Sequence, residues 1–200
     1  IVGYAAVVAY PNLPSLDALT SYQPKIPLQI FSMEGSLIGE FGEEKRAFLK
    51  IDQTPGLLRK AIIAAEDERF YEHGGVDYIG VLRAALSNFA SASARQGAST
   101  ITMQVARNFF LSTEKTFSRK FSEALLAFKI EHSLTKDEIL QLYINQIYLG
   151  QRAYGFGAAS QVYFGKQLEQ LSVAEIAMLA GLPKAPSRYN PVVNMNRAKI

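Results

Sequence analysis

The stretch TPGLLRKAIIAAEDERFYEHGG, residues 54–75, is where the chain first shows the pattern that decides its fold. Leu58, Ile62 and Ala65 recur every three or four residues, which predicts one apolar face of a helix. Glu66 stands four residues after Ile62, so it continues that stripe instead of facing away from it. The stretch therefore predicts a helix that carries a carboxylate into a polar turn.

The helical spacing continues downstream of this turn and predicts three more helices. Their apolar faces are formed by Ile79, Leu82, Leu86 and Phe89, by Ile101, Val105 and Phe109, and by Phe121, Leu125 and Phe128. Either Ser99 or Thr100 can cap the helix that starts near Ile101. Two capping-box patterns predict two further helix starts, at Thr135 to Glu138 and at Ser172 to Glu175.

Upstream of residue 54 the pattern is extended. Leu28, Ile30, Leu37 and Phe41 flank Glu34-Gly35-Ser36, which is typical of a hairpin turn. The predicted class is therefore mainly α, with a small extended or β segment near the N-terminus. On this basis residues 15–53 are expected to form an extended or hairpin linker, and residues 54–200 the main helical domain.

The first ten residues, Ile1 to Tyr10, are uncharged and mostly apolar. A membrane-spanning helix needs roughly 20 such residues. Two interpretations are open: a short buried element of the core, or the outer end of a membrane anchor whose beginning has been cut away. Pro11 and Pro14 end the run in either case, so residues 1–14 form one segment of the predicted organisation.

The composition of the 200 residues is that of a globular domain, with 48% hydrophobic and 20% charged residues. Cysteine is absent, which excludes disulfides and thiolate metal sites. Residues 1–77 carry 7 basic and 11 acidic residues, whereas residues 78–136 carry 8 basic and 3 acidic ones. The net charge of +3 thus conceals a cationic middle segment, which contains no recognised nucleic-acid-binding motif.

Two carboxylates have surroundings that suit chemistry. Glu66 is expected near a helix C-terminus on an apolar stripe, where desolvation and the helix dipole make an ionised carboxylate a better base. The alternative for Glu66 is a solvated acidic turn. Glu123 follows Arg119 and Lys120 by four and three residues, so the three can share one helix face. That group is either an ordinary surface ion pair or an anion site.

Four ordered motifs in these regions resemble those of the peptidoglycan glycosyltransferases, glycosyltransferase family 51. They are Glu66 to Gly75, Gln96 to Gln104, Arg119 to Glu123 and Lys136 to Asn145. The segments Arg152 to Gly157 and Gly181 to Ser187 further resemble the class A, bifunctional penicillin-binding proteins. The resemblance covers roughly residues 55–195 and implies a lysozyme-like helical fold with a head lobe and a membrane-proximal jaw lobe. It also implies that residues 54–200 are a glycosyltransferase domain truncated at its C-terminus.

The resemblance implies polymerisation of lipid II into β-1,4-linked glycan strands, with inversion and release of undecaprenyl diphosphate. Glu66 and Glu123 would be catalytic, with Glu66 as the general base. Glu123 would orient the cations or hold a divalent cation, Mg²⁺ or Mn²⁺, and no organic cofactor is expected. The implied substrate-binding residues are Asp67, Phe70, His73, Arg83, Gly97, Ser99, Thr100, Gln104, Arg107, Asn108, Lys115, Arg119 and Lys120.

The implied partners are lipid II, the growing glycan strand, the membrane and other cell-wall synthesis proteins, with no nucleic acid. The implied location is the bacterial cytoplasmic membrane, with a single-pass anchor and the catalytic domain facing the periplasm. With a lipid-linked substrate, residues 1–14 are expected to be the end of that anchor. Two other functions are weighed against this: a lytic glycan hydrolase, and a catalytically silent glycan-binding or scaffold module. Met103 and Ser122 depart from the family motifs, which usually have glutamine and lysine there.

Overall fold

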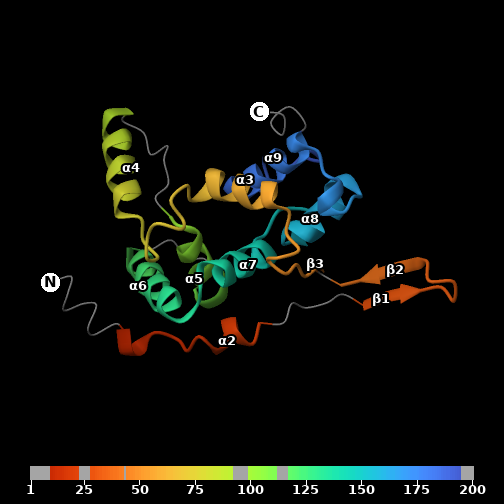
Figure 1. The fold of residues 1–200 in the computed structure, drawn as a ribbon, viewed down its shortest axis with the longest axis horizontal. Coiled ribbons are helices and arrows are strands. Elements are labelled where there is room, and N and C mark those ends of the chain that lie inside the picture. Colours follow the sequence, from red (N-terminus) through yellow and green to blue (C-terminus); the bar gives the residue numbers. More distant parts are fainter. Residues whose placement is uncertain (1–9, 23–27, 43, 92–98, 112–116, 195–200) are drawn as a thin grey trace. The chain divides into compact units, whose positions relative to one another are not determined.

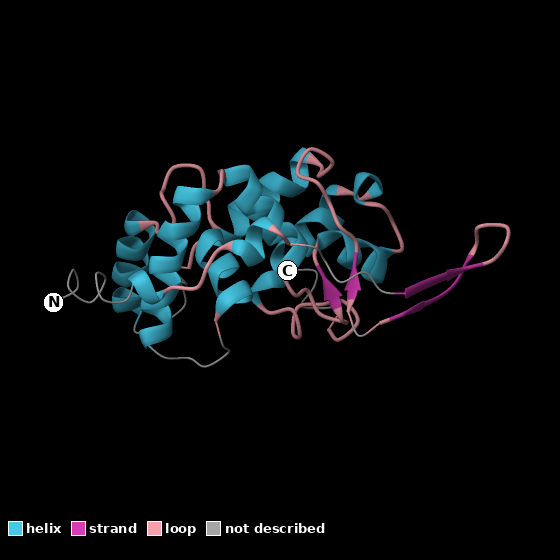
Figure 2. Cartoon of the chain, turned by 90° about the horizontal axis from the view of Figure 1, so that it is seen from below, coloured by secondary structure: helices cyan, strands magenta, loops and turns pink. Residues whose placement is uncertain are grey.

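The computed structural model describes residues 10–22, 28–42, 44–91, 99–111 and 117–194 of the chain (Figure 1). The described part is mainly helical, which confirms the predicted class, and strands occur only in a hairpin and one short pair (Figure 2). The helices are α2 (Asp17–Thr20), α3 (Gly56–Glu66), α4 (Tyr78–Ser91), α5 (Ile101–Phe110), α6 (Phe117–Ser133), α7 (Lys136–Gln146), α8 (Phe156–Phe164) and α9 (Val173–Gly181). Short 3₁₀ turns are η1 (Tyr10–Asn12), η2 (Leu168–Gln170) and η3 (Leu182–Lys184).

The chain divides into two compact units, and each unit is built from two separate stretches of the sequence. Unit 1 comprises residues 1–22 and 66–143, and unit 2 comprises residues 23–65 and 144–200. Most of the predicted anchor end, residues 1–9, lies outside the described residues. Among the residues that are described, none of the helices has the length and apolar character needed to cross a bilayer.

Unit 1 is built on the packing of α5 against α6. Every residue from Ile101 to Ala106 is buried, and Leu126 and Ile130 of α6 are fully buried. The Thr100 side chain accepts a hydrogen bond from the Met103 N–H, so Thr100 is the N-cap, one of the two candidates that the sequence offered. This half of α5 therefore has no solvent-facing side, and its position is set by the unit's core.

An upstream strap, residues 10–22, belongs to the same unit. Leu19 is buried, and the Lys129 ammonium on α6 donates to the Pro14 carbonyl at 2.9 Å. The Tyr22 ring meets the Phe109 ring of α5 edge-on, with 5.3 Å between ring centroids. The strap thus contacts both helices that form the centre of unit 1.

Helix α4 forms where predicted, but its predicted apolar face is not a core face. Ile79, Leu82 and Leu86 are each about 60% exposed, whereas Ala84 is buried. Periodicity identifies an apolar face without identifying what covers it. The correction extends to Ala65 of α3, which is exposed although Leu58 and Ile62 on the same helix are fully buried.

Unit 2 contains the predicted hairpin. Strand β1 (Leu28–Phe31) pairs antiparallel with β2 (Leu37–Phe41), starting from Leu28 opposite Phe41. Gly35 has a φ of +84° in the connecting turn, a conformation that glycine adopts without steric cost. The hairpin prediction is therefore confirmed in both strands and turn.

A second strand pair and helix α8 were not predicted. Strand β3 (Lys45–Arg46) pairs in parallel with β4 (Ala153–Tyr154), and α8 packs against both strands and α9. Small residues dominate the first turns of α8, so no wide apolar stripe marks the helix in the sequence. A Cβ on Gly157 would lie 2.9 Å from the Ala47 carbonyl oxygen, so this close packing depends on glycine.

Both predicted capping boxes are present. The Thr135 N–H donates to the Glu138 carboxylate at 2.8 Å, and the Ser172 N–H donates to the Glu175 carboxylate at 2.7 Å. A hydrogen bond from Lys166, together with the Ser172 N–H, lowers the pKa of Glu175 to about 2. The helices that start at Lys136 and Val173 therefore begin where local sequence predicts.

Asn145 fixes the extended segment that follows β3. Its side-chain oxygen accepts from the Leu49 N–H and its amide donates to the Leu49 carbonyl, both at 2.8 Å. Asn145 is 3% exposed, so water cannot readily replace these two bonds. A single side chain thus satisfies both backbone groups of a residue 96 positions away.

Replacing this side chain is expected to destabilise the fold. In Asn145→Ala both backbone groups of Leu49 lose their partner, at a cost of about 1–3 kcal/mol in the free energy of unfolding. Urea unfolding of the two proteins measures this cost. Gln161→Ala, an exposed amide on α8, is the matched control and is expected to change stability by less than about 0.5 kcal/mol. Equal midpoints for the two variants would contradict the role given to Asn145.

Candidate active site

Glu66 is the last residue of α3 and is half-buried. The side-chain amide of Gln104 donates to Glu66 Oε2 at 2.8 Å. Gln104 belongs to α5 and is only 7% exposed, so its own position is determined by the core of unit 1. Glu66 is therefore an oriented carboxylate held from α5, and the expectation of a position at the helix C-terminus is confirmed.

Asp67, the next residue, has a different environment. It is 8% exposed, and its Oδ2 accepts from the Ile101 N–H at 2.9 Å. His73 Nε2 lies 2.9 Å from Asp67 Oδ1, and the Gly75 N–H donates to His73 Nδ1 at 3.2 Å. Because Nδ1 accepts, Nε2 carries the proton and donates to Asp67. Asp67 and His73 thus hold the turn together and attach it to the start of α5.

Thr100 makes the same connection from the other side. Its hydroxyl donates to the Gly75 carbonyl at 2.6 Å, and its oxygen also accepts from Met103 as the helix cap. Gly75 has a φ of +99°, and a Cβ there would lie 2.9 Å from the carbonyl carbon of Ala127. The turn between Glu66 and Gly75 is therefore pressed against α6 and bonded to α5.

The second carboxylate, Glu123, is completely buried on α6. Lys120 Nζ lies 2.6 Å from its Oε2, and Arg119 Nε lies 3.1 Å from its Oε1. The Lys120 ammonium also donates to the Ser99 hydroxyl at 2.6 Å, just before the cap of α5. The predicted helix face is confirmed, and the burial of Glu123 argues against an ordinary surface pair.

The surroundings of Glu123 bear on the expected divalent cation. Both carboxylate oxygens face cationic side chains. Among the described residues there is no group of three or more histidines or acids that could hold a metal ion. The described donors therefore do not fit a bound Mg²⁺ or Mn²⁺ at Glu123.

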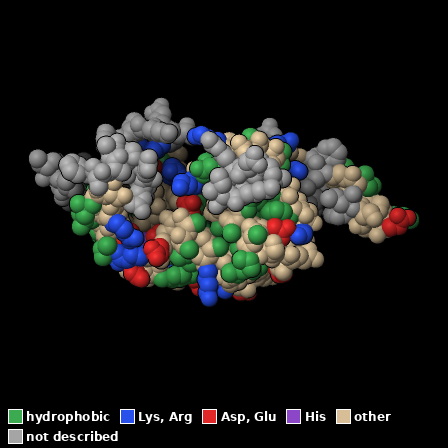
Figure 3. Space-filling model, turned by 90° about the horizontal axis from the view of Figure 1, so that it is seen from above, with side chains coloured by type: hydrophobic (Ala, Val, Ile, Leu, Met, Phe, Trp, Pro, Cys, Tyr) green, Lys and Arg blue, Asp and Glu red, His purple; other side chains and the backbone are tan. Residues whose placement is uncertain are grey.

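The remaining predicted residues fall into three groups. Arg107 on α5 is half-buried, whereas Arg83 and Asn108 are exposed. Arg83 Nη1 lies 3.7 Å from Glu68 Oε2. Phe70 is fully buried beneath the Lys136 ammonium, which lies 4.4 Å from the ring centroid. Gly97 and Lys115 lie outside the described residues. On the face shown in Figure 3, basic and acidic side chains lie next to each other in several places.

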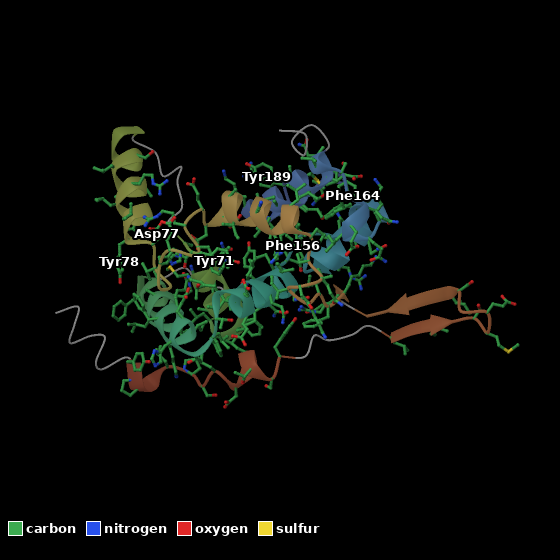
Figure 4. All side chains as sticks on the ribbon, viewed as in Figure 1. Tyr71, Asp77, Tyr78, Phe156, Phe164 and Tyr189 are labelled. Carbon is green, nitrogen blue, oxygen red and sulfur yellow. The ribbon has the colours of Figure 1, made fainter. Side chains whose placement is uncertain are left out.

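The polar turn has further attachments on its surface. Arg69 pairs with Glu72 at 2.8 Å and with Asp77 at 3.1 Å. The Tyr71 hydroxyl donates to Asp137 at the start of α7, at 2.9 Å. Figure 4 labels Tyr71 and Asp77 among the side chains of this region. These exposed and partly buried contacts add to the buried ones at Asp67 and Thr100.

Tyr143 is a residue of this site that sequence reasoning did not single out. It lies on α7, is fully buried, and burial raises its pKa well above the usual value of 10. The charge of Glu66 raises that pKa further and the charge of Arg107 lowers it. The Tyr143 hydroxyl is therefore within the electrostatic range of both groups. Its place in the Lys136 to Asn145 motif was the available signal.

Comparison with known proteins identifies the family to which this chain belongs. The profile of the family described as "Transglycosylase" matches residues 34–200, which is most of the chain. The chain belongs to the transglycosylase family. The resemblance stated from the motifs is thereby confirmed.

The relatives of this transglycosylase chain include penicillin-binding proteins 1A. The one from Neisseria cinerea is 62% identical over 200 residues, which is 100% of this chain and 25% of the relative. The one from Escherichia coli strain K12 is 56% identical over 188 residues, or 94% of this chain and 22% of the relative. The 2.6 Å crystal structure of penicillin-binding protein 1A from Haemophilus influenzae is 30% identical, covers 88% of this chain and 17% of that one, and has a TM-score of 0.45. The transglycosylase chain thus spans about a quarter of the length of these curated relatives.

One departure from the family motifs has a structural explanation in this transglycosylase. Met103 is 7% exposed and contributes its backbone N–H to the Thr100 cap. The position therefore needs a side chain that packs in the core, and methionine fills irregular space well. Ser122 is half-buried beside the buried Glu123, and nothing in the structure explains the serine.

Gly75→Ala tests whether the turn depends on its close approach to α6. The new Cβ would meet the Ala127 carbonyl at a positive φ, so we expect a loss of about 3 kcal/mol in unfolding free energy. Gly165→Ala is the matched control, because Gly165 also has a positive φ but no atom within 4 Å of the added Cβ. Its expected loss is about 1 kcal/mol. Urea unfolding of both variants makes the comparison, and equal losses would show that the contact with α6 does not constrain the turn.

Proposed function

We propose that this transglycosylase domain polymerises lipid II, a disaccharide-pentapeptide on undecaprenyl diphosphate, into β-1,4-linked glycan strands. The observation that supports this best is the presence in unit 1 of an oriented carboxylate, Glu66, and of two cations paired with the buried Glu123. A base for the acceptor and positive charge for the diphosphate are the two requirements of this transfer. The match to the transglycosylase family supports the same reaction.

Glu66 acts as the general base in this proposal. Its carboxylate accepts the proton of the acceptor's 4-hydroxyl while that oxygen attacks the anomeric carbon of the donor chain. Attack opposite the leaving group inverts the configuration, as in inverting glycosidases, where one carboxylate also activates the nucleophile. The hydrogen bond from Gln104 orients the carboxylate before substrate binds, which reduces the entropy cost of reaching the reactive geometry.

The cations stabilise the leaving group. An undecaprenyl diphosphate departs as an anion, so it needs positive charge and no proton. Arg119 and Lys120 carry two positive charges against the one negative charge of Glu123, which leaves an excess of one. Lys120 is 44% exposed on its side chain, so its ammonium can reach a ligand while Glu123 holds it in place. In this proposal Arg107 on α5, which is half-buried, is a third cation.

A lipid-linked substrate places the reaction at a membrane surface. We therefore propose the bacterial cytoplasmic membrane as the location, with the domain facing the periplasm and anchored by a single-pass segment. The exposed apolar side chains of α4 support contact with such a surface. Because the relatives are about four times as long and are named penicillin-binding proteins, we also propose a transpeptidase domain elsewhere in the full-length protein and other cell-wall synthesis proteins as partners.

The base is tested by Glu66→Gln in the full-length protein. The amide cannot accept the proton, so extension of labelled lipid II is expected to fall at least about 10²-fold while lipid II binding survives. Glu72→Gln is the control, because Glu72 is an exposed carboxylate in the same turn and its ion pair is with Arg69. It is expected to retain activity.

Other outcomes of this assay decide against the proposal. Full activity of Glu66→Gln would remove Glu66 as the base. Cleavage of finished glycan without use of lipid II would identify a lytic hydrolase. Binding of glycan with neither reaction would identify a silent binding or scaffold module.

Lys120→Gln tests the leaving-group site. Loss of the ammonium removes the excess positive charge beside Glu123, so kcat for lipid II extension is expected to fall about 10²-fold. Lys60→Gln removes an exposed lysine of α3 and is expected to leave kcat unchanged. Measuring both rates at several salt concentrations separates a local effect from general charge attraction. An unchanged kcat in Lys120→Gln would move the diphosphate site away from α6.

A further inference from the structure

A partly buried ion pair in unit 1, between Glu131 and Lys136, is not used by the proposed reaction. Glu131 on α6 accepts from the Lys136 ammonium at 2.7 Å and from the Thr102 hydroxyl at 2.6 Å, both at Oε1. The side chains of Glu131 and Lys136 are 10% and 19% exposed, and Thr102 is fully buried. The three residues lie on α6, α7 and α5, so this polar contact joins three helices.

Lys136 also contacts the turn that follows Glu66. Its ammonium lies 4.4 Å from the centroid of the Phe70 ring, within the range of a cation–π interaction. Phe70 is fully buried, and its N–H donates to the Asp67 carbonyl at 2.9 Å. The Lys136 ammonium therefore contacts α6 through Glu131 and the turn that follows Glu66 through Phe70.

The two ends of this network are close in sequence to the two residues of the Glu66–Gln104 hydrogen bond. Phe70 is four residues after Glu66 on the turn, and Thr102 is two residues before Gln104 on α5. In the described part of the chain the Lys136 ammonium contacts Glu131 and the Phe70 ring, and it touches neither Glu66 nor Gln104. Any action on the carboxylate must therefore pass through the elements that carry it.

We propose that Lys136 is a positioning residue for the Glu66–Gln104 pair, holding the turn and α5 at the spacing in which the carboxylate is oriented. The inference rests on the proposed function for its kinetic consequence, and on the contacts alone for its structural one. Without the ammonium, the Thr102 hydroxyl is the one partner that Glu131 keeps among the described residues, and the Phe70 ring loses its cation. A partly buried carboxylate without its cation is stabilised by moving toward water. Such a movement of Glu131 lets α5 and the turn that carries Phe70 shift relative to each other.

Lys136→Met in the full-length protein tests this proposal, because methionine keeps an apolar stem without the charge. We expect kcat for lipid II extension to fall at least 10-fold while KM changes less than about 3-fold, since a small misplacement of a base slows chemistry more than binding. Lys136→Arg is expected to recover most of the rate, because a guanidinium can pair with Glu131 and stack on Phe70. Lys166→Met, which removes the 2.6 Å pair with Glu175 in unit 2, is the matched control.

Hydrogen exchange of the full-length proteins provides a second readout that does not depend on activity. Lys136→Met is expected to raise exchange in residues 67–75 and 101–106 and to leave residues 156–164 of α8 unchanged. A uniform increase across all three segments would mean a general loss of stability and would overturn the positioning role. So would a kcat within twofold of the unsubstituted protein, a loss no larger than that of Lys166→Met, or no recovery in Lys136→Arg.

The two readouts also separate this proposal from the proposed function. If the unsubstituted protein does not extend lipid II, the proposed function fails, while a local exchange change in Lys136→Met still supports the structural link. If lipid II is extended and Lys136→Met changes neither kcat nor local exchange, the proposed function stands and the positioning role of Lys136 is wrong.

Discussion

A carboxylate removed from water must be hydrogen-bonded, and the structure of unit 1 depends on how Asp67 meets this requirement. Its oxygens accept from the Ile101 N–H and from His73, whose other ring nitrogen accepts from the Gly75 N–H. These bonds attach the turn to the first N–H group of α5. Because α5 also supplies Gln104, the helix that anchors the turn is the one that orients Glu66.

Three carboxylates within the motifs illustrate how environment separates roles. Asp67 is buried and bonded to backbone and histidine, which suits a structural contact. Glu123 is buried between two cations, which suits holding those cations for an anion. Glu66 is half-buried with an amide donor on one oxygen, which suits proton transfer. Burial and partner type therefore give the same functional group three different environments in unit 1.

The local sequence predicted what depends on local physics. The predicted hairpin, the capping boxes at Thr135 and Ser172 and the shared face of Arg119, Lys120 and Glu123 are confirmed. The cap of α5 is Thr100, one of two predicted candidates. Contacts between distant segments could not be read from spacing. The Lys136–Phe70 contact, the Asn145–Leu49 bonds and the burial of Tyr143 join segments whose proximity arises only on folding. The exposed face of α4 differs for the same reason, since amphipathic spacing does not specify a partner.

The Asn145 amide has a consequence for strand alignment in unit 2. The pairing of β3 with β4 is only two residues long, and a pair this short has little to prevent it from slipping by one position. Such a slip would turn Arg46 to the opposite face, away from the Tyr154 ring that it now covers at 4.5 Å. Asn145 pairs with Leu49 as a neighbouring peptide group would, three residues beyond Arg46. The Asn145 side chain thus helps to fix the register of the two-residue parallel pair of β3 and β4.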